Sequence, residues 1–408
     1  MSRYYRIVVT DPSNGNVLVP NWQNAPGFSW VPPDPNLSTW TSLYSGGVVT
    51  NALANNPNAQ QIEFDIVVVS ADLPYANPWV RVWGVGLAEI QQASQLNKMQ
   101  IEVYGGFSAG LPLNDASQSG LLCRGLVLQA FGNWIGTAQS IDIFIVAGGS
   151  SPSSNQTTGN PSSQSTTPVP TTNEAPANIV YQAKQGQPML QAIVQCLQNA
   201  FPQYSIVGAV DQGLVWNKSV TTGYHSTLRT FAQYIRQASL SIIGGYAPNR
   251  TDYGGVGITL FDNTFTISDQ TTTLGQKTIS FIDLIGQPSW VGPGLIQVTT
   301  TMRAGISVND VVLLQASPLT TVYDQQGGGT NTSFVPEPQL GGTYAQFKSS
   351  NQFTGSAWQV LSVRSVGNFR DPNPLSWVTA YDLKVADNTN TQTSGAESFP
   401  VLYQAPSS

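Results

Sequence analysis

The chain has 408 residues, and only 9% of them are charged, with 16 Lys and Arg against 22 Asp and Glu for a net charge of −6. So low a charge density excludes most coiled coils and helical bundles, and the acidic balance disfavours a grip on nucleic-acid phosphates. With 40% hydrophobic residues the chain is not disordered, and its purely apolar runs, such as Ile66–Val69, are too short to span a membrane. Arg3 and Arg6 precede only a short apolar run, so we expect no signal peptide and synthesis in a cytoplasm without membrane insertion.

Period-two alternation predicts that the part before residue 148 is built of strands. In Ile62–Val68 the apolar side chains fall on one face, and Glu63 and Asp65 fall on the other. One short helix is predicted over Leu87–Leu96, and the proline- and asparagine-rich stretch Asn21–Asn58 is expected to be a long excursion loop. The other strands predicted here are Tyr4–Val9, Trp79–Trp83, Met99–Tyr104, Leu121–Ala130 and Ile141–Val146.

Residues 148–177 are interpreted as a flexible linker, because they hold almost no large apolar side chain that could offset the entropy of ordering. Two amphipathic helices follow: Met189–Ala200, with Pro188 at its first turn, and a helix from Thr227 to Ser239 with Ser226 as its N-cap. Further flexible loops are expected at Gln325–Thr332 and Asp387–Ala396, and strands at Gly257–Ile267, Leu295–Thr301, Asp310–Gln315, Trp358–Val366 and Ser376–Val385.

A weak internal repeat is visible in this pattern. Leu121–Ile145 reads as a strand, a loop around Gly132–Trp134 and a strand, and Trp358–Val385 reads as a strand, a loop around Gly367–Phe369 and a strand. Each pair would close a β-domain, although two hairpins with wide loops can also arise by chance. The sequence therefore predicts a mainly β protein with a small α/β insert, made of two tube-like β-barrel domains and a helix-containing middle domain.

The predicted organisation has five parts. These are an N-terminal β-barrel domain over 1–147, a linker or long loop over 148–177, a mixed α/β middle domain over 178–275, a second β-barrel domain over 276–387 and a C-terminal tail over 388–408. Within the tail, Phe399–Tyr403 is an apolar cluster on a polar tether. We expect this cluster to dock, either on the chain's own barrel or as an added strand on a neighbouring protein.

No constellation of catalytic residues emerges, and we predict that the chain is not an enzyme. Gly106–Gly110 matches the nucleophile elbow G-x-S-x-G around Ser108, but loop residues follow the serine where a helix is needed. The single histidine, His225, lies in another predicted domain. A hairpin turn explains the serine motif better, and His225 is interpreted as a polar residue at a helix entry.

The remaining candidates also point to structure. Glu63 and Asp65 share one strand face and could form an acid–base pair, but that polar face is expected to meet solvent or a channel. Glu89 stands where a dinucleotide-binding fingerprint would need a small residue. Cys123 and Cys196 are too few for a structural zinc site and are interpreted as free core thiols. We therefore predict no catalytic, cofactor-binding or metal-binding residues, and no cofactor.

Three segments of the chain resemble the central baseplate hub proteins of contractile-tailed bacteriophages. In the first, a strand leads to the turn Gly105–Phe107, and the next strand carries Arg124-Gly125. The second is the helical stretch Gln187–Gln237. In the third, Ile282–Leu314, a basic residue precedes a glycine turn at Arg303 and Gly305.

The C-terminal strands extend the resemblance. Trp377–Thr379 fits the W-x-T step that hub proteins often have near their last strand. Hub proteins often carry histidine where Ser365 or Val366 stands, and this chain departs from them there. The loop Asn21–Asn58 and the linker 148–177 have no counterpart in the family pattern.

The resemblance implies a structural virion protein, a tail baseplate hub that joins the hexameric tail tube to the trimeric spike and leaves a channel for DNA. It implies a homotrimer with two tube-like barrels per chain, so that three chains match six tube subunits. Implied partners are the tail tube protein, the spike protein and other baseplate proteins, while DNA passes without specific binding.

Three other functions remain open. A tail-fibre or receptor-binding β-protein would recognise host surface sugars, and a tail-associated peptidoglycan hydrolase would depend on Ser108 or Glu63. A type VI secretion spike component would share the hub fold, but such proteins usually carry a long β-helical extension that this sequence lacks.

Overall fold

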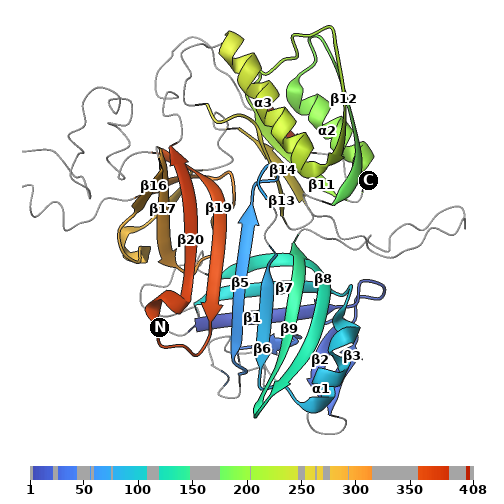
Figure 1. Ribbon diagram of the computed structural model, residues 1–408, viewed down its shortest axis with the longest axis vertical. Helices are drawn as coiled ribbons and strands as arrows, with labels where there is room; N and C mark the ends of the chain where they lie inside the picture. The colour runs from blue at the N-terminus through green and yellow to red at the C-terminus, as the bar shows by residue number, and fades with distance from the viewer. Residues whose placement is uncertain are drawn as a thin grey trace, which may run out of the picture.

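The computed structural model is mainly β, with a small helical part, as the sequence predicts. Figure 1 shows two groups of sheet strands beside a layer that carries the two longer helices. Most strands belong to one 15-stranded sheet. The structure describes residues 3–21, 26–43, 56, 59–74, 77–107, 119–147, 175–202, 204–246, 253–261, 264–269, 276–292, 294–314, 357–385 and 401–404.

The N-terminal strands form one end of the long sheet, in the order β5-β6-β9-β8-β7-β1-β2-β3, with β4 on β1. Helix α1 (Leu87–Gln92) continues as the 3-10 turn η1 (Ala93–Leu96), as predicted for this stretch. The strands are β1 (Arg3–Thr10), β2 (Val17–Asn21), β3 (Gly27–Val31), β4 (Trp40–Thr41), β5 (Ile62–Val69), β6 (Trp79–Trp83), β7 (Gln100–Phe107), β8 (Gly120–Ile135) and β9 (Ala138–Ala147).

Alternation explains why these strands pack as they do. In β5, Ile62, Phe64 and Ile66 are buried in the N-terminal core, while Glu63 and Asp65 lie on the opposite face. Neighbouring strands repeat the pattern, so one face of the sheet is apolar and the other is polar.

Two sequence predictions are wrong in this region. Asn21–Asn58 is not a single excursion loop, because β3 pairs with β2 and β4 pairs with β1. Gly132–Trp134 is not a loop either: these residues continue β8 and pair with β9, and the turn comes only at Gly136-Thr137. In both cases the pairing of neighbouring strands decides the conformation, which single-segment composition does not reveal.

The C-terminal strands form the other end of the sheet, in the order β16-β17-β20-β19, with β18 and β15 continuing beyond β19. The predicted loop around Gly367–Phe369 is also wrong at its start, because Gly367 pairs with Trp377 inside the ladder. The elements are β15 (Gln276–Ile279), η3 (Phe281–Asp283), β16 (Ser289–Gly292), β17 (Leu295–Thr301), β18 (Val311–Leu314), β19 (Ala357–Asn368), η5 (Pro374–Ser376) and β20 (Trp377–Val385).

The two ends are joined directly, since β5 pairs antiparallel with β19 from Glu63–Asn368 to Val69–Ser362. The strand order therefore runs from β16 to β3 as an open path, and the described strands close no barrel. The sequence predicted two separate barrels. Instead, β5 and β19 pair with one another rather than each closing its own sheet.

The two ends share one topology, which we call the five-strand unit. In chain order the strands of each unit lie side by side as first, second, fifth, fourth, third: β5-β6-β9-β8-β7 and β16-β17-β20-β19-β18. Every pairing within both units is antiparallel. A β-bulge also falls at the same place in both, at Leu128 of β8 and Leu361 of β19. The internal repeat is thus a feature of the fold.

The middle layer packs two helices against two small sheets, one of two strands and one of four. Its buried residues form a separate core cluster, which includes Ala71 from the end of β5. The elements are β10 (Pro176–Lys184), α2 (Met189–Ala200), β11 (Ser205–Val210), β12 (Val220–Thr227), α3 (Leu228–Tyr246), β13 (Gly257–Phe261), β14 (Thr264–Ser268) and β21 (Val401–Gln404).

Helix α2 has the predicted bounds, whereas α3 continues beyond the predicted end at Ser239, to Tyr246. Three further details of this layer differ from prediction. The N-cap of α3 is Thr227 rather than Ser226, because the Thr227 Oγ1 accepts the Thr230 amide at 3.2 Å. Gly257–Ile267 is not one strand, because β13 and β14 pair antiparallel with each other. Strand β10 begins at Pro176, inside the predicted linker.

The remaining linker residues and both predicted flexible loops lie outside the described residues. The residue limits predicted for the domains stay a prediction.

Candidate functional site

The polar face of the long sheet carries ordered ion pairs. Arg81 of β6 lies opposite Glu63 of β5 and Asp142 of β9. Its guanidinium donates to both carboxylate oxygens of Asp142, at 2.5 and 2.8 Å, and this raises the pKa of Arg81. The same guanidinium lies over the rings of Trp83 and Trp79, with its carbon 5.3 and 5.8 Å from their centroids. The Asp142 carboxylate therefore binds the edge of the guanidinium, and the two indole rings lie against its flat face.

A second ion pair crosses the junction between the units. Arg364 of β19 donates to both oxygens of Asp65 in β5, at 2.9 and 2.6 Å. Asn368 donates to Glu63 at 3.3 Å. Both carboxylates that the sequence singled out are thus engaged in strand-to-strand contacts, and they lie on the polar face as predicted.

A third arginine on this face is also paired. Arg124 Nε donates to Glu102 at 2.9 Å, and the Tyr104 hydroxyl donates to the other Glu102 oxygen at 2.8 Å. Burial, and next the Glu102 carboxylate, raise the pKa of Tyr104 to about 12. The arginines of β6, β8 and β19 on this face are therefore each bonded to a carboxylate. Arg6 of β1 lies over the Tyr104 ring and donates to the Ser38 hydroxyl and to two backbone carbonyls.

The predicted turn at Gly105–Phe107 is wrong, because these residues end β7 and pair with β1. Gly106 and the W-x-T step nevertheless meet in the core. The indole of Trp377 donates to the Gly106 carbonyl at 2.8 Å and packs edge-on against Phe64, with ring centroids 5.3 Å apart. A side chain at Gly105 would come within 2.9 Å of the Met302 sulfur. Trp377, from the C-terminal unit, therefore completes the core of the N-terminal unit.

Arg303 is buried and has a structural environment. Its Nη1 donates to Asp283 at 3.1 Å, and its amide donates to Thr379 Oγ1 at 3.2 Å. Tyr381 lies fully buried nearby, and burial raises its pKa. In the sequence, Arg303 stood out only through the resemblance to hub proteins. In the structure it contacts Thr379 of the W-x-T step.

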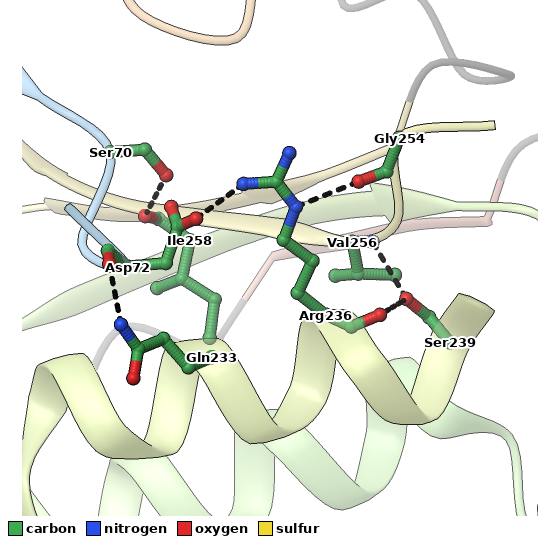
Figure 2. Close-up of polar contacts among 8 residues, drawn as sticks. All are labelled: Ser70, Asp72, Gln233, Arg236, Ser239, Gly254, Val256 and Ile258. Carbon is green, nitrogen blue, oxygen red and sulfur yellow. Dashed lines mark hydrogen bonds and ion pairs between the residues drawn. The ribbon is translucent and has the colours of Figure 1, made fainter. Parts of the chain in front are cut away.

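A cluster of polar contacts joins the end of β5 to the middle layer, and we call it the latch (Figure 2). Arg236 of α3 forms an ion pair with Asp72 and also donates from Nε to the Gly254 carbonyl at 2.9 Å. Gln233, one helical turn earlier, donates to the Asp72 carbonyl at 3.0 Å. No motif in the sequence identified these residues, because they are about 160 positions apart.

Backbone contacts extend the latch. The Ala71 amide donates to the Ile258 carbonyl at 2.8 Å, and Ser239 Oγ accepts the Val256 amide at 2.9 Å. Gly255, which precedes Val256, has a φ of +85°, and a side chain there would come within 2.8 Å of Arg236. The N-terminal unit is thus tied to α3 and β13 by a mixture of charge, backbone and close packing.

His225 lies near the end of β12, three residues before α3, and its ring packs against Phe231 and Tyr234 at centroid distances of 5.4 and 5.0 Å. Burial lowers its pKa. This placement agrees with a residue at a helix entry. Ser108 lies outside the described residues.

Glu89 has a role that sequence reasoning missed. It is buried, and its carboxylate accepts the Gly86 amide at 2.6 Å, which is the glutamate half of a capping box at the start of α1. The spacing from Gly86 to a glutamate three residues later was the available signal.

Cys123 and Cys196 are free and buried, and burial raises the pKa of each thiol to about 12. Within the described part of the chain, no three or more His, Cys, Asp and Glu side chains gather in a way that could hold a metal ion. None of the described helices is long and apolar enough to cross a membrane.

The tail segment predicted to dock does so within its own chain. Strand β21 pairs antiparallel with β11, from Val207–Gln404 to Val210–Val401. Its partner is the four-stranded sheet of the middle layer rather than a barrel, because β11 offers an open sheet edge there.

No protein-family model and no curated protein sequence matches the chain. Among solved structures, a tail protein from Neisseria meningitidis MC58 is similar at 8% identity and a TM-score of 0.41, over 94% of this chain and 97% of that one. A 43 kDa tail protein of prophage MuSo2 from Shewanella oneidensis is similar at 9% identity and 0.42, over 94% and 99%. A Francisella PdpA-VgrG complex gives 8% and 0.38, over 98% of this chain and 60% of that one. These neighbours are tail and VgrG proteins, and likenesses at this level assign no function to the chain.

Proposed function

We propose that the chain is the central hub of a contractile phage tail baseplate, a homotrimer in the virion that joins the six-fold tail tube to a three-fold spike. The duplicated five-strand unit carries this proposal. Two equivalent units in each chain give six in a trimer, so a three-fold assembly presents six like surfaces to the tube. The sequence motifs shared with hub proteins support it, because Gly106 and Trp377 meet where the two units join.

The polar face of the long sheet is the part of the hub that lines a channel for DNA. A phosphate backbone is bound tightly by free arginine and lysine side chains. On this face Arg81, Arg124 and Arg364 are each already bonded to a carboxylate. Such a wall lets DNA pass without holding it.

Electron microscopy of assembled tails in which this chain carries a visible label tests the proposal. We expect the label at the joint between tube and spike, in a particle with three-fold symmetry. A label along tail fibres, or a solid two-fold particle, would contradict the proposal and favour the receptor-binding alternative.

The proposed role involves no catalysis. Glu63 and Asp65 are engaged by Asn368 and Arg364, and His225 packs in the middle layer. A peptidoglycan zymogram and an esterase assay on the purified protein should both be negative. Activity that disappears in Ser108→Ala would overturn this part of the proposal.

A further inference from the structure

The two five-strand units use equivalent edges differently. In the chain, the first strand of the N-terminal unit, β5, pairs with the half of β19 that follows its bulge, Ser362–Asn368. The corresponding edges are β16 and the half of β8 that follows its bulge. Among the described strands, β16 pairs only with β17. Pairing of β8 with β7 ends at Leu126, and the Ala130 amide is capped by Asn97. Beyond Ala130, β9 is the one described strand that pairs with β8.

Exposed apolar side chains gather on these two edges. On β8 the exposed fractions are 54% for Leu128, 37% for Phe131, 62% for Trp134 and 77% for Ile135, and on β16 Val291 is 57% exposed. A sheet edge that is both unpaired and apolar is a template for another strand, and natural proteins usually protect such edges.

The paired edge has a different composition at the same positions. Counting from the two bulges, Phe131 corresponds to Arg364, and Trp134 corresponds to Gly367. Arg364 forms its ion pair with Asp65 across the junction, and Gly367 lies against the ring of Phe64. The apolar residues thus occur on the edge that has no partner among the described strands.

We propose that β16 of one copy pairs antiparallel with the second half of β8 of another copy, which repeats between chains the β5–β19 pairing within each chain. The inference rests on the proposed trimer and names the contact that holds it together. A head-to-tail contact of this kind closes into a ring when the rotation is right, and it then covers β16 and the second half of β8 in every copy.

The repeat also sets the register. Ser289 lies opposite Gln297 in β17, and Asp65 lies opposite Trp79 in β6. Gln297 and Trp79 occupy the same place in the second strand of their units, so Ser289 corresponds to Asp65. Asn133 corresponds to Val366, since each follows its bulge by five residues. Asp65 lies opposite Val366 inside the chain, so Ser289 of one copy is placed opposite Asn133 of the next.

Cysteine pairing between chains tests this register. Directly opposite residues of antiparallel strands have Cβ atoms about 4.5–5.5 Å apart, and a small closing movement brings them to the roughly 3.5–4.5 Å that a disulfide needs. A mixture of Asn133→Cys and Ser289→Cys chains should give a disulfide-linked dimer, and the double variant should give a closed covalent trimer that reductant dissolves. The native thiols are buried and do not interfere.

The matched control replaces Ser289→Cys with Gln297→Cys. Gln297 is exposed and lies opposite Ser289 but one strand further from the edge, so its distance from Asn133 of the next copy is about 10 Å. This pair should not cross-link, and equal cross-linking of both pairs would overturn the register.

A charge on the edge gives an independent measurement. Val291→Asp should reduce assembly at least tenfold in apparent association constant, because it places a carboxylate in the apolar contact. The control Leu375→Asp changes a side chain of like exposure, 56%, in η5 rather than on either edge, and should leave assembly unchanged.

The outcomes separate this inference from the proposed function. A trimer by mass without the Asn133–Ser289 cross-link, or one that Val291→Asp leaves intact, would overturn the interface and leave the hub role standing. A single copy at every concentration, with no cross-link, would overturn both.

Discussion

The N-terminal and C-terminal five-strand units have the same strand order and the same bulge, yet their surroundings differ. The first strand of the N-terminal unit is covered by β19, whereas the first strand of the C-terminal unit, β16, is the last in the order of described strands. The N-terminal unit also gains β1, β2, β3 and α1 beyond its five strands. One topology can therefore serve as an internal joint in one place and as an open edge in another.

Side-chain chemistry follows this difference rather than the topology. Equivalent positions carry Arg364 and Gly367 on the covered joint, but Phe131 and Trp134 on the open edge. Trp377, in contrast to Trp134, is buried and lies at the joint between the units. Changes at matched positions in the two regions should therefore have unequal effects.

The largest difference is expected between two tryptophans. Trp377→Ala removes a side chain that is 2% exposed, its hydrogen bond to Gly106 and its contact with Phe64, and should lower the free energy of unfolding by about 3–5 kcal/mol. Trp134→Ala removes a 62% exposed side chain and should change it by about 0.5 kcal/mol or less. Urea unfolding followed by circular dichroism measures both, and equal losses would contradict the contrast.

The latch should contribute less than the joint. Asp72→Asn leaves the partly buried Arg236 guanidinium without its carboxylate, and the expected loss is about 2 kcal/mol. Arg236→Gln should cost a similar amount, and the double variant should cost less than the sum of the two. Hydrogen exchange at Ala71, whose amide bonds to Ile258, should accelerate in each variant, and unchanged exchange there would mean that the latch does not tie the layers together.

Loss of β21 should have a smaller effect that is confined to the middle layer. A chain shortened after Asn388 exposes the edge of β11, so its melting temperature should fall by a few degrees and amides of β11 should exchange faster. An unchanged melting temperature together with lost binding to a baseplate partner would show that the segment serves another chain instead.

The smallest effect concerns His225. Burial lowers its pKa, so as the pH falls the unfolded chain takes up a proton, from about pH 6.5, before the folded protein does. Stability from this residue is therefore complete above pH 7 and declines as the pH falls toward 5. His225→Gln should show a slightly weaker loss of melting temperature between pH 7.5 and 5.5 than the natural protein, and identical losses would exclude a contribution.

Local patterns in the sequence predicted many of the elements well. The strand at Trp79–Trp83 and the helix Met189–Ala200 have the predicted bounds, because each is specified by its own alternation or helical stripe. The repeat was also visible, but the sequence aligned Gly132 with Gly367, since an asparagine follows each glycine. The bulges of the structure align Gly132 with Ser365 instead. A bulge shifts the register by one residue and leaves no clear mark in a single sequence.

What the sequence could not supply were the contacts between distant segments. Pairing of β5 with β19 joins residues about 300 positions apart, and the latch joins Asp72 to Arg236. The short strands β10, β11 and β12 were missed, and they are ordered by their neighbours more than by their own propensity. The polar face was predicted from Glu63 and Asp65 alone, while their basic partners become visible only once the strands are paired.

The mass of the purified protein in solution tests the central claim most directly. If the two five-strand units of each chain form a three-fold ring, native mass spectrometry should give three times the chain mass of 43.6 kDa, and Val291→Asp should shift the population toward the single chain. A stable dimer, or a single chain at every concentration measured, would contradict the account.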